Sequence, residues 1–527
     1  MKKPSSKYAI ALTAALGLFM AVLDNTIVNV ALTPMATALN ASLSSIQWVI
    51  TGYFLTQAAV IPAAGYFSLR FGIKKLFIIC LLFFTFGSLL CGLAQSETML
   101  IAFRVLQGLG GGALFPLAQS IALRAFPPAE RANASAVTGI PVLLAPAFGP
   151  TIGGLLTDTL GWEYIFFINV PVGILAAFLA WKIIPADESV AERKQAPFDF
   201  VGLSLSILGV LAVVYAFTLV SETIPGSASA ANPRGTIQGW GYWPVWALLG
   251  AGVILLVSFA VYELRFVKDP VLDLRLYKNY NFAVASIITW LASIMVFGSL
   301  FLLPIFLEQV RYPHTSALDA GLALMPQGLA AGVAVALSGR ILYNRIGVRA
   351  LAMMGAVALI ISSWQLSQLT PTSDGVSIMP WIILRGLGFG WAVIPVQTLA
   401  LQAIVGPALP KASSLFNVMR QIFSSIGIAI VSTLFVQQAA QHATELQRSL
   451  PTPPPGVTLD PNSPTVQAAR QQLAAQAGTN AVNDVFLIVT IGSIIILLAA
   501  LALPGRPKKF ETTAEGRQPA PELSIAE

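Results

Sequence analysis

The stretch KYAIALTAALGLFMAVLDNTIVNVALTPMA covers residues 7–36 and indicates the class of the whole chain. A membrane-spanning helix needs roughly 20 apolar residues, and this stretch is longer than that. Its only acidic residue is Asp24. A carboxylate at bilayer depth is costly, so it is usually paired, hydrated or functional. Of the 23 acidic residues in the chain, only Asp24 lies clearly inside a predicted span, which makes it our leading candidate for a proton-carrying group.

Apolar stretches of similar length recur along the chain. The 527 residues are 56% hydrophobic and 10% charged, whereas a soluble domain carries about 25% charged residues. This composition predicts an all-α, polytopic membrane protein. The fourteen predicted spans are residues 8–36, 46–68, 76–94, 98–122, 132–156, 163–183, 200–221, 243–263, 281–307, 317–339, 348–369, 377–402, 412–435 and 484–503.

The chain starts with basic residues before an apolar run, as a secretory signal peptide does. The run is too long for a signal peptide and no small-residue cleavage site follows, so we predict a retained first span. Cys80 and Cys91 fall in the third span, where two thiols make no metal site and core packing is the simpler interpretation. We expect neither a metal nor another cofactor.

The basic residues are unevenly distributed between the two sides of the predicted spans. Of the 30 Lys and Arg, 23 lie in the N-terminal segment, in the loops after every second span or in the C-terminal tail. The others are Arg234, Arg311, Arg448 and Arg470 on the opposite side, and Arg104, Arg385 and Arg420 within spans. This bias predicts a multi-pass protein of the inner (plasma) membrane with both termini in the cytoplasm. It also explains the net charge of +7 without a nucleic-acid partner.

The fourth and twelfth spans share a pattern. Gly108, Gly110, Gly112 and Gln119 recur 278 residues later as Gly386, Gly388, Gly390 and Gln397. A second similarity joins residues 65–72 to residues 339–347, with one extra residue. These matches predict two six-helix halves related by an axis along the membrane normal, with spans seven and eight inserted between them. Many secondary transporters alternate access by rocking such halves around a central site.

The predicted organisation has four parts. They are an N-terminal six-helix bundle over residues 1–185, a linker with two inserted helices over 186–275, a C-terminal six-helix bundle over 276–504 and a polar tail over 505–527. The composition of the tail predicts cytoplasmic disorder. Residues 436–483, rich in Gln, Ala and Pro, are predicted to form an external loop that includes a segment of helical composition.

The motifs of the chain resemble those of the major facilitator superfamily, in particular its fourteen-helix drug:proton antiporter family, the EmrB/QacA type. Residues 23–32, LDNTIVNVAL, are similar to the family's first-span motif, although the proline that the family places at Thr33 is Pro34 here. The resemblance covers nearly the whole chain. It implies the major facilitator fold and export by alternating access in exchange for protons.

Asp24 and Arg104 are the main candidates for proton coupling. Low dielectric favours a neutral carboxyl group and a nearby cation favours a charged one, so Asp24 would switch as a cationic substrate or an arginine approaches. The alternative is a permanent Asp–Arg bridge that only holds helices together. Arg104 belongs to the motif that the family links to proton transfer, and we expect it to approach Asp24 unless it snorkels to the external interface. Glu308, at the outer end of the ninth span, is either a second candidate acid or an external surface carboxylate.

Two further motifs are expected to control conformational change. Residues 65–75 resemble the superfamily's loop motif through Gly65, Arg70, Gly72 and Lys74, but the family's aspartate is Leu69 here. Residues 139–154 resemble the antiporter motif through Gly139, Pro146, Gly149, Pro150, Gly153 and Gly154. The resemblance implies a hinge or seal that prevents leak, and close helix packing without directional meaning is the alternative.

Helix position alone selects the candidate substrate contacts. They are Asn25, Asn29, Tyr53, Phe54, Gln57, Gln119 and Trp391. The supply of aromatic residues and Met suits a pocket for hydrophobic or cationic organic molecules. Arg420 lies near the cytoplasmic end of its span, where it has a function or simply snorkels.

We therefore predict a proton-coupled antiporter for multidrug efflux, which exports hydrophobic or cationic organic compounds. Its partners are the lipid bilayer, small-molecule substrates and protons, and no sequence feature identifies a membrane-fusion partner. A dedicated exporter of an endogenous lipid, siderophore or amino acid is the second candidate. A membrane-embedded enzyme is disfavoured because His314 and His442 are the only histidines, both predicted external, and no catalytic motif occurs.

Overall fold

The computed structural model describes residues 6–41, 43–186, 199–222, 224, 238–267, 270–300, 302–313, 317–402, 404, 406, 408–449 and 463–505. Within these ranges the chain is helical and contains no strand. Thirteen helical stretches in these ranges are long and apolar enough to cross a membrane, and each coincides with a predicted span. The remaining predicted span, 132–156, coincides with a helix of 29 residues over Arg131–Thr159. The prediction of an all-α polytopic membrane protein is confirmed.

The helices follow one another with short connections. The first group is α1 (Lys7–Ala38), α2 (Leu43–Ile46), α3 (Trp48–Phe71), α4 (Ile73–Gly92), α5 (Glu97–Ala125), η1 (Pro128–Glu130), α6 (Arg131–Thr159), α7 (Tyr164–Phe167) and α8 (Asn169–Ile183). Then come α9 (Phe200–Ser221), α10 (Trp243–Arg265) and η3 (Leu274–Lys278). The last group is α11 (Tyr280–Leu300), α12 (Leu302–Ile305), η4 (Phe306–Val310), α13 (Ala317–Leu337), η5 (Ser338–Leu342), α14 (Tyr343–Leu366), α15 (Gly375–Gln402), α16 (Ala408–Ser449) and α17 (Pro464–Ala500).

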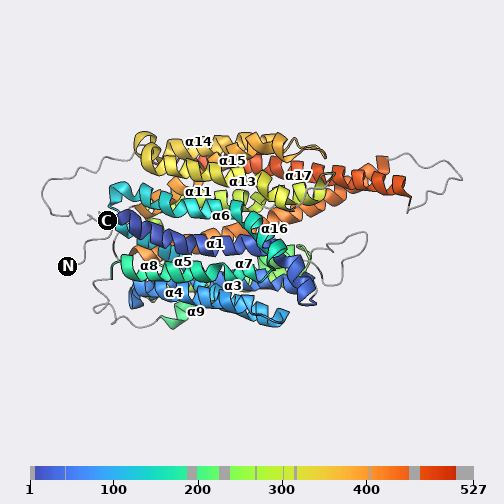
Figure 1. Ribbon diagram of the computed structural model, residues 1–527. Coiled ribbons are helices and arrows are strands. Elements are labelled where there is room, and N and C mark those ends of the chain that lie inside the picture. The colour runs from blue at the N-terminus through green and yellow to red at the C-terminus, as the bar shows by residue number, and fades with distance from the viewer. Residues whose placement is uncertain are drawn as a thin grey trace.

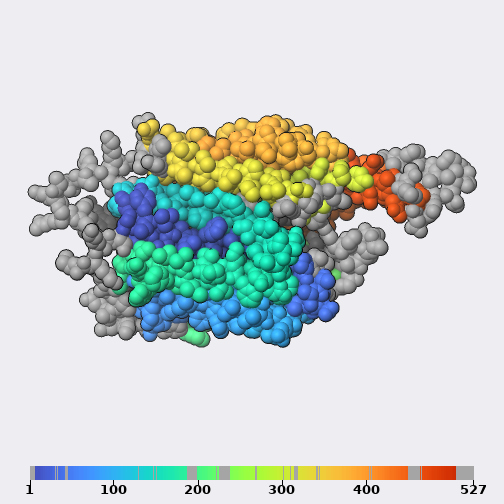
Figure 2. Space-filling view, viewed as in Figure 1, coloured from blue at the N-terminus to red at the C-terminus, as the bar shows by residue number. Residues whose placement is uncertain are grey.

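The first and last groups form two bundles that lie side by side (Figures 1 and 2). We call them the N-half (α1–α8) and the C-half (α11–α17). They meet mainly where α3, α5 and α6 pack against α13, α15 and α16. The inserted helix α9 packs against α10 and also contacts both α3 and α16, so it lies along the junction of the halves. The end of the molecule that carries Lys7 and Leu503 is called the basic end below.

The sequence repeat is present in the packing. A Cβ atom on Gly110 would lie 2.4 Å from the carbonyl oxygen of Cys80 in α4, and one on Gly388 would lie 2.9 Å from the carbonyl oxygen of Gly355 in α14. Equivalent helices of the two halves therefore pack through equivalent glycines. The second similarity is preserved in the backbone: Gly72 and Gly347 both have positive φ, 86° and 83°, a conformation that glycine adopts without strain.

The helices α16 and α17 are longer than predicted. They have 42 and 37 residues, or about 63 and 56 Å at 1.5 Å per residue, whereas a bilayer core is only about 30 Å thick. Most of the described part of the predicted external loop 436–483 continues these two helices. Figure 1 shows α17 projecting beyond the rest of the bundle at the end opposite the basic end. His442 of α16 and Asp484 of α17 join the two helices there, with 2.7 Å between Nε2 and Oδ2.

Candidate functional site

Asp24 lies in the interior of the N-half and is paired with Arg104. The exposed fractions of these residues are 0% and 1%. Arg104 Nη1 is 2.5 Å from Asp24 Oδ2, so α1 and α5 are joined by a buried ion pair. Arg104 also donates from Nη1 to Gln107 Oε1 at 2.8 Å and from Nε to the carbonyl oxygen of Val49 at 3.0 Å. The predicted approach of Arg104 to Asp24 is confirmed, and snorkelling of Arg104 is wrong.

Two amides complete the shell of the carboxylate. Asp24 Oδ1 accepts from Gln107 Nε2 at 3.0 Å and from Asn169 Nδ2 at 2.8 Å. Asn169 is the first residue of α8 and also donates to Ser88 Oγ of α4 at 3.1 Å. Sequence reasoning did not single out Asn169 and missed this contact. The available signal was an amide side chain at the start of an otherwise apolar helix.

Aromatic rings enclose the cation of the pair. The guanidinium carbon of Arg104 lies 3.9 Å from the ring centroid of Tyr53 and 5.6 Å from that of Phe166. Rings at this distance stabilise a cation while keeping water away from it. With its hydrogen-bond partners, the Asp24–Arg104 pair meets the requirement that a buried ion pair be compensated. The site therefore links α1, α3, α4, α5 and α8 through one titratable carboxyl group.

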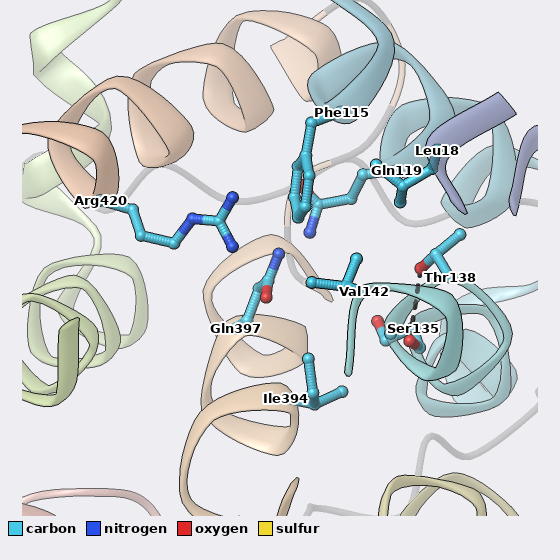
Figure 3. Close-up of a pocket in the computed structure, with 10 residues that line it drawn as sticks. Leu18, Phe115, Gln119, Ser135, Thr138, Val142, Ile394, Gln397 and Arg420 are labelled. Carbon is cyan, nitrogen blue, oxygen red and sulfur yellow. Dashed lines mark hydrogen bonds between the residues drawn. The ribbon is translucent and has the colours of Figure 1, made fainter. Parts of the chain in front are cut away.

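A second polar region lies between the halves, in a small central cavity (Figure 3). The N-half contributes Leu18 of α1, Phe115 and Gln119 of α5, and Ser135, Thr138, Gly139 and Val142 of α6; the C-half contributes Ile394 and Gln397 of α15 and Arg420 of α16. In this conformation the cavity has room for on the order of one water molecule. The repeat-related residues Gln119 and Gln397 thus meet in one cavity.

Arg420 points into this cavity instead of reaching the membrane surface. Its guanidinium carbon lies 4.0 Å from the ring centroid of Phe115 in the opposite half. The alternative that Arg420 simply snorkels is therefore wrong. A snorkelling side chain extends along its own helix towards water, whereas this one crosses the junction of the two halves.

The other predicted substrate contacts lie outside the described lining of the cavity. Asn25 and Asn29 are joined on α1, Asn29 Nδ2 donating to the carbonyl oxygen of Asn25 at 3.0 Å, and Asn29 is exposed. Phe54 makes an edge contact with the ring of Tyr53, 6.3 Å between centroids. The remaining two are half-buried: Gln57 packs its backbone against Gly112 of α5, and Trp391 packs against the hydrophobic cluster that both halves and the inserted helices share. Among the predicted contacts, Gln119 is the residue that lines the central cavity.

Glu308 lies apart from the Asp24 cluster. It belongs to η4 in the C-half, and its neighbours Phe306 and Leu307 pack into a hydrophobic cluster with α15 and α17. Glu308 itself is half-buried. The structure therefore does not bring the two predicted acids together.

The glycines of the predicted conformational motifs lie at close helix contacts. A Cβ atom on Gly65 would lie 2.9 Å from the carbonyl oxygen of Pro410 in α16, across the junction of the halves, and one on Gly139 would lie 3.1 Å from Ile394. Glycines 149 and 153 instead face α1 at Thr26 and Ile27. Gly154 is half-buried in the same helix, while the side chains of Pro146 and Pro150 lie outside the described part of the structure. The glycine motif of α6 therefore serves both the junction and the α1 contact.

The loop motif lies at the basic end. Gly72 joins α3 to α4, and Lys74 donates from Nζ to the carbonyl oxygen of Trp181 at 2.7 Å, which ties α4 to α8. Arg70 is half-buried in the last turn of α3. These contacts hold the N-half together beside the junction.

Arg131 connects the halves at the basic end. Its Nη1 donates to the carbonyl oxygens of Leu401, Gln402 and Ile404 at 3.0, 2.7 and 2.7 Å. Carbonyls at a helix C-terminus lack intrahelical donors and attract cations. Arg131 at the start of α6 therefore closes the C-terminus of α15 in the other half.

We expect Arg131→Gln to favour separation of the halves at the basic end. A hydrogen bond to a charged group contributes about 1.5–3 kcal/mol, so the open population should rise roughly tenfold or more. Double electron–electron resonance between spin labels at Pro127→Cys and Arg345→Cys would measure the open population. Lys75→Gln, which removes an exposed cation at the same end, is the control. An unchanged distance distribution in Arg131→Gln would contradict the closing role.

Two repeated helical halves around a central cavity define a secondary transporter of small molecules. A relative from Haemophilus influenzae, named multidrug export protein EmrB, is 35% identical over 441 residues, which is 83% of this chain and 82% of the relative. The fatty acid resistance protein FarB of Neisseria gonorrhoeae is 34% identical over 439 residues, 82% of each. The solved structure of the proton:xylose symporter XylE matches with a TM-score of 0.59 at 14% identity, over 95% of this chain and 96% of that one, and shows the fold alone.

The family model of the Major Facilitator Superfamily matches residues 14–428. The chain belongs to this superfamily. The matched range begins within α1 and ends within α16, so it covers most of both halves and the two inserted helices but not α17. The resemblance drawn from the motifs is confirmed.

Proposed function

We propose that this chain is a proton-coupled efflux antiporter that exports hydrophobic or cationic organic compounds by alternating access. The observation that supports the proposal most directly is the fully buried Asp24–Arg104 pair in the N-half. An ionisable residue within a membrane span is a functional candidate by default. Sequence similarity to relatives that are named multidrug export proteins, such as EmrB, supports the same proposal.

The geometry suggests how protonation is linked to movement. The Asp24 carboxylate holds Arg104, Gln107 and Asn169 at once. A proton on this group would remove its charge and weaken the contact with Arg104. Because α1 and α5 also supply Leu18 and Gln119 to the central cavity, a rearrangement of the pair is transmitted to the cavity along two helices.

We further propose that the basic end faces the cytoplasm and that the membrane is the inner (plasma) membrane. The bias of Lys and Arg towards that end supports this orientation. The direct contacts made by Gly65 and Arg131 then close the cytoplasmic side in this conformation. Protons would reach Asp24 from outside and leave to the inside after the halves rock.

A dedicated exporter of an endogenous lipid, siderophore or amino acid remains the second candidate, and a lipid is the substrate for which there is a supporting observation. One relative carries the name fatty acid resistance protein, and a central cavity lined by both apolar and polar side chains suits an amphiphile. The two candidates share the proton-coupled mechanism and differ only in substrate range.

Everted membrane vesicles test the proposed function. Vesicles energised by a pH gradient, acidic inside, should take up ethidium-like cations or lipid amphiphiles, and addition of substrate should release protons from the lumen. Vesicles without the protein are the control. Substrate uptake that persists unchanged after the pH gradient is collapsed would contradict proton coupling.

A further inference from the structure

The central cavity contains a cation that no acidic residue of its described lining balances. Its polar lining consists of amides and hydroxyls together with Arg420. Among the described residues, no carboxylate lies within ion-pairing distance of this guanidinium, in contrast to the pairing of Arg104 with Asp24. Charged side chains at membrane depth usually pair with one another or mark a path for a charged ligand.

The neighbours of Arg420 present donors as well. Gln119 Oε1 already accepts from Ser413 Oγ at 2.7 Å and from Asn417 Nδ2 at 3.1 Å, which leaves its amide nitrogen directed away from α16. Figure 3 shows this nitrogen, the amide nitrogen of Gln397 and the guanidinium of Arg420 turned towards the same space beside Phe115. Converging donors, one of them a guanidinium without a carboxylate partner, form a site that favours an anion.

The repeat shows that packing alone does not require an arginine here. Arg420 follows Val142 by 278 residues, the same separation as between Gln119 and Gln397, and all four residues line the cavity. The N-half fills the equivalent position with an apolar side chain. Only the C-half therefore places a cation, Arg420, at this repeat-related position of the cavity lining.

We propose that the central cavity binds the headgroup of an amphipathic organic anion. A carboxylate, sulfonate or phenolate group would contact Arg420 and the amides of Gln119 and Gln397, while its apolar part packs on Phe115, Leu18 and Ile394. The proposal rests on the proposed efflux function and narrows its cargo at this cavity from hydrophobic or cationic compounds to amphipathic anions. Because the cavity is nearly closed in this conformation, the halves must separate before such a ligand enters.

Binding of three compounds of equal chain length tests the proposal. Decyl sulfonate, decanol and decyltrimethylammonium, each below its micellar concentration, are added to the purified full-length protein, and quenching of tryptophan fluorescence gives each affinity. The wild type should bind the sulfonate at least about tenfold more tightly than the ammonium compound, because a buried guanidinium favours an anion and repels a cation. A wild type that prefers the ammonium compound would overturn the proposal.

Substitutions in the cavity separate charge from packing. Arg420→Gln should abolish the preference for sulfonate, Arg420→Lys should retain part of it as the charge-matched control, and Gln397→Glu should reverse it by placing a carboxylate beside Arg420. Decanol binding within about twofold of wild type would show that each variant keeps the cavity intact. A sulfonate-to-ammonium ratio that is unchanged in both Arg420→Gln and Gln397→Glu would overturn the proposal.

Transport currents distinguish this inference from the proposed function. With one proton entering per substrate, export of a monoanion moves two positive charges inward, whereas export of a monocation moves none. Solid-supported membrane recordings on proteoliposomes should therefore show a larger current with decyl sulfonate. Proton-linked export of the ammonium compound alone would refute the anion site and leave the efflux function standing, while absence of proton-linked transport for every compound would refute the efflux function.

Discussion

Asp24→Asn is expected to abolish proton-linked transport. Asparagine has nearly the same shape as aspartate but cannot take up and release a proton. It also leaves the Arg104 guanidinium buried without its counter-charge, and breaking one side of a buried pair costs about 3–5 kcal/mol. In everted vesicles the variant should show no substrate-triggered proton release, a loss of at least about a hundredfold, and its melting temperature in detergent should fall.

Two further variants separate coupling from folding. Asp158→Asn makes the same chemical change at an exposed acid near the end of α6 and should transport normally. The double variant Asp24→Asn/Arg104→Gln removes both charges, so it should recover stability without recovering proton release. Coupled transport in the double variant would instead identify the pair as a permanent bridge that only holds α1 and α5 together.

Gly110→Ala is expected to produce the largest loss of stability among single-methyl changes in α5. The added Cβ atom would lie 2.4 Å from the carbonyl oxygen of Cys80 and 2.5 Å from the backbone nitrogen of Phe84. Both atoms belong to the backbone of α4, which cannot rotate away as a side chain does. Forcing the two helices apart costs about 1–3 kcal/mol or more, which thermal unfolding in detergent would detect as a shift of several degrees.

Gly250→Ala is the matched control for Gly110→Ala. Gly250 also lies within a helix, α10, but a Cβ atom there would meet nothing within 4 Å. Alanine favours helix over glycine by about 1 kcal/mol, so this variant should unfold at the same or a slightly higher temperature. Equal melting temperatures for the two alanine variants would show that the α4–α5 contact tolerates an added methyl group.

The repeat and the buried pair could be predicted because both depend only on residue spacing and on the presence of ionisable residues in apolar spans. A constant separation places Gln119 and Gln397 at equivalent positions whatever the helix tilt. An acid and an arginine within apolar spans have few partners other than each other. These two inferences needed no knowledge of side-chain direction.

The remaining contacts depend on how helices rotate and cross. Tyr53 was selected as a substrate contact, but the rotation of α3 places its ring against Arg104 inside the N-half. Asn169 was not among the predicted site residues, yet the break between α7 and α8 directs its amide to Asp24. Arg420 sits at a depth where snorkelling is reasonable, and only the crossing of α16 with α5 brings it over Phe115. Sequence position fixes depth in the membrane but not the direction a helix face takes.

The junction between the halves has a consequence for the surroundings of the protein. Gln119 meets Ser413 and Asn417 as neutral partners, and the buried Arg131 meets backbone oxygens instead of an acidic side chain. Salt screens the attraction between solvent-exposed charges, and neither of these contacts depends on such a pair. The contacts that Gln119 and Arg131 make across the junction should therefore depend little on ionic strength.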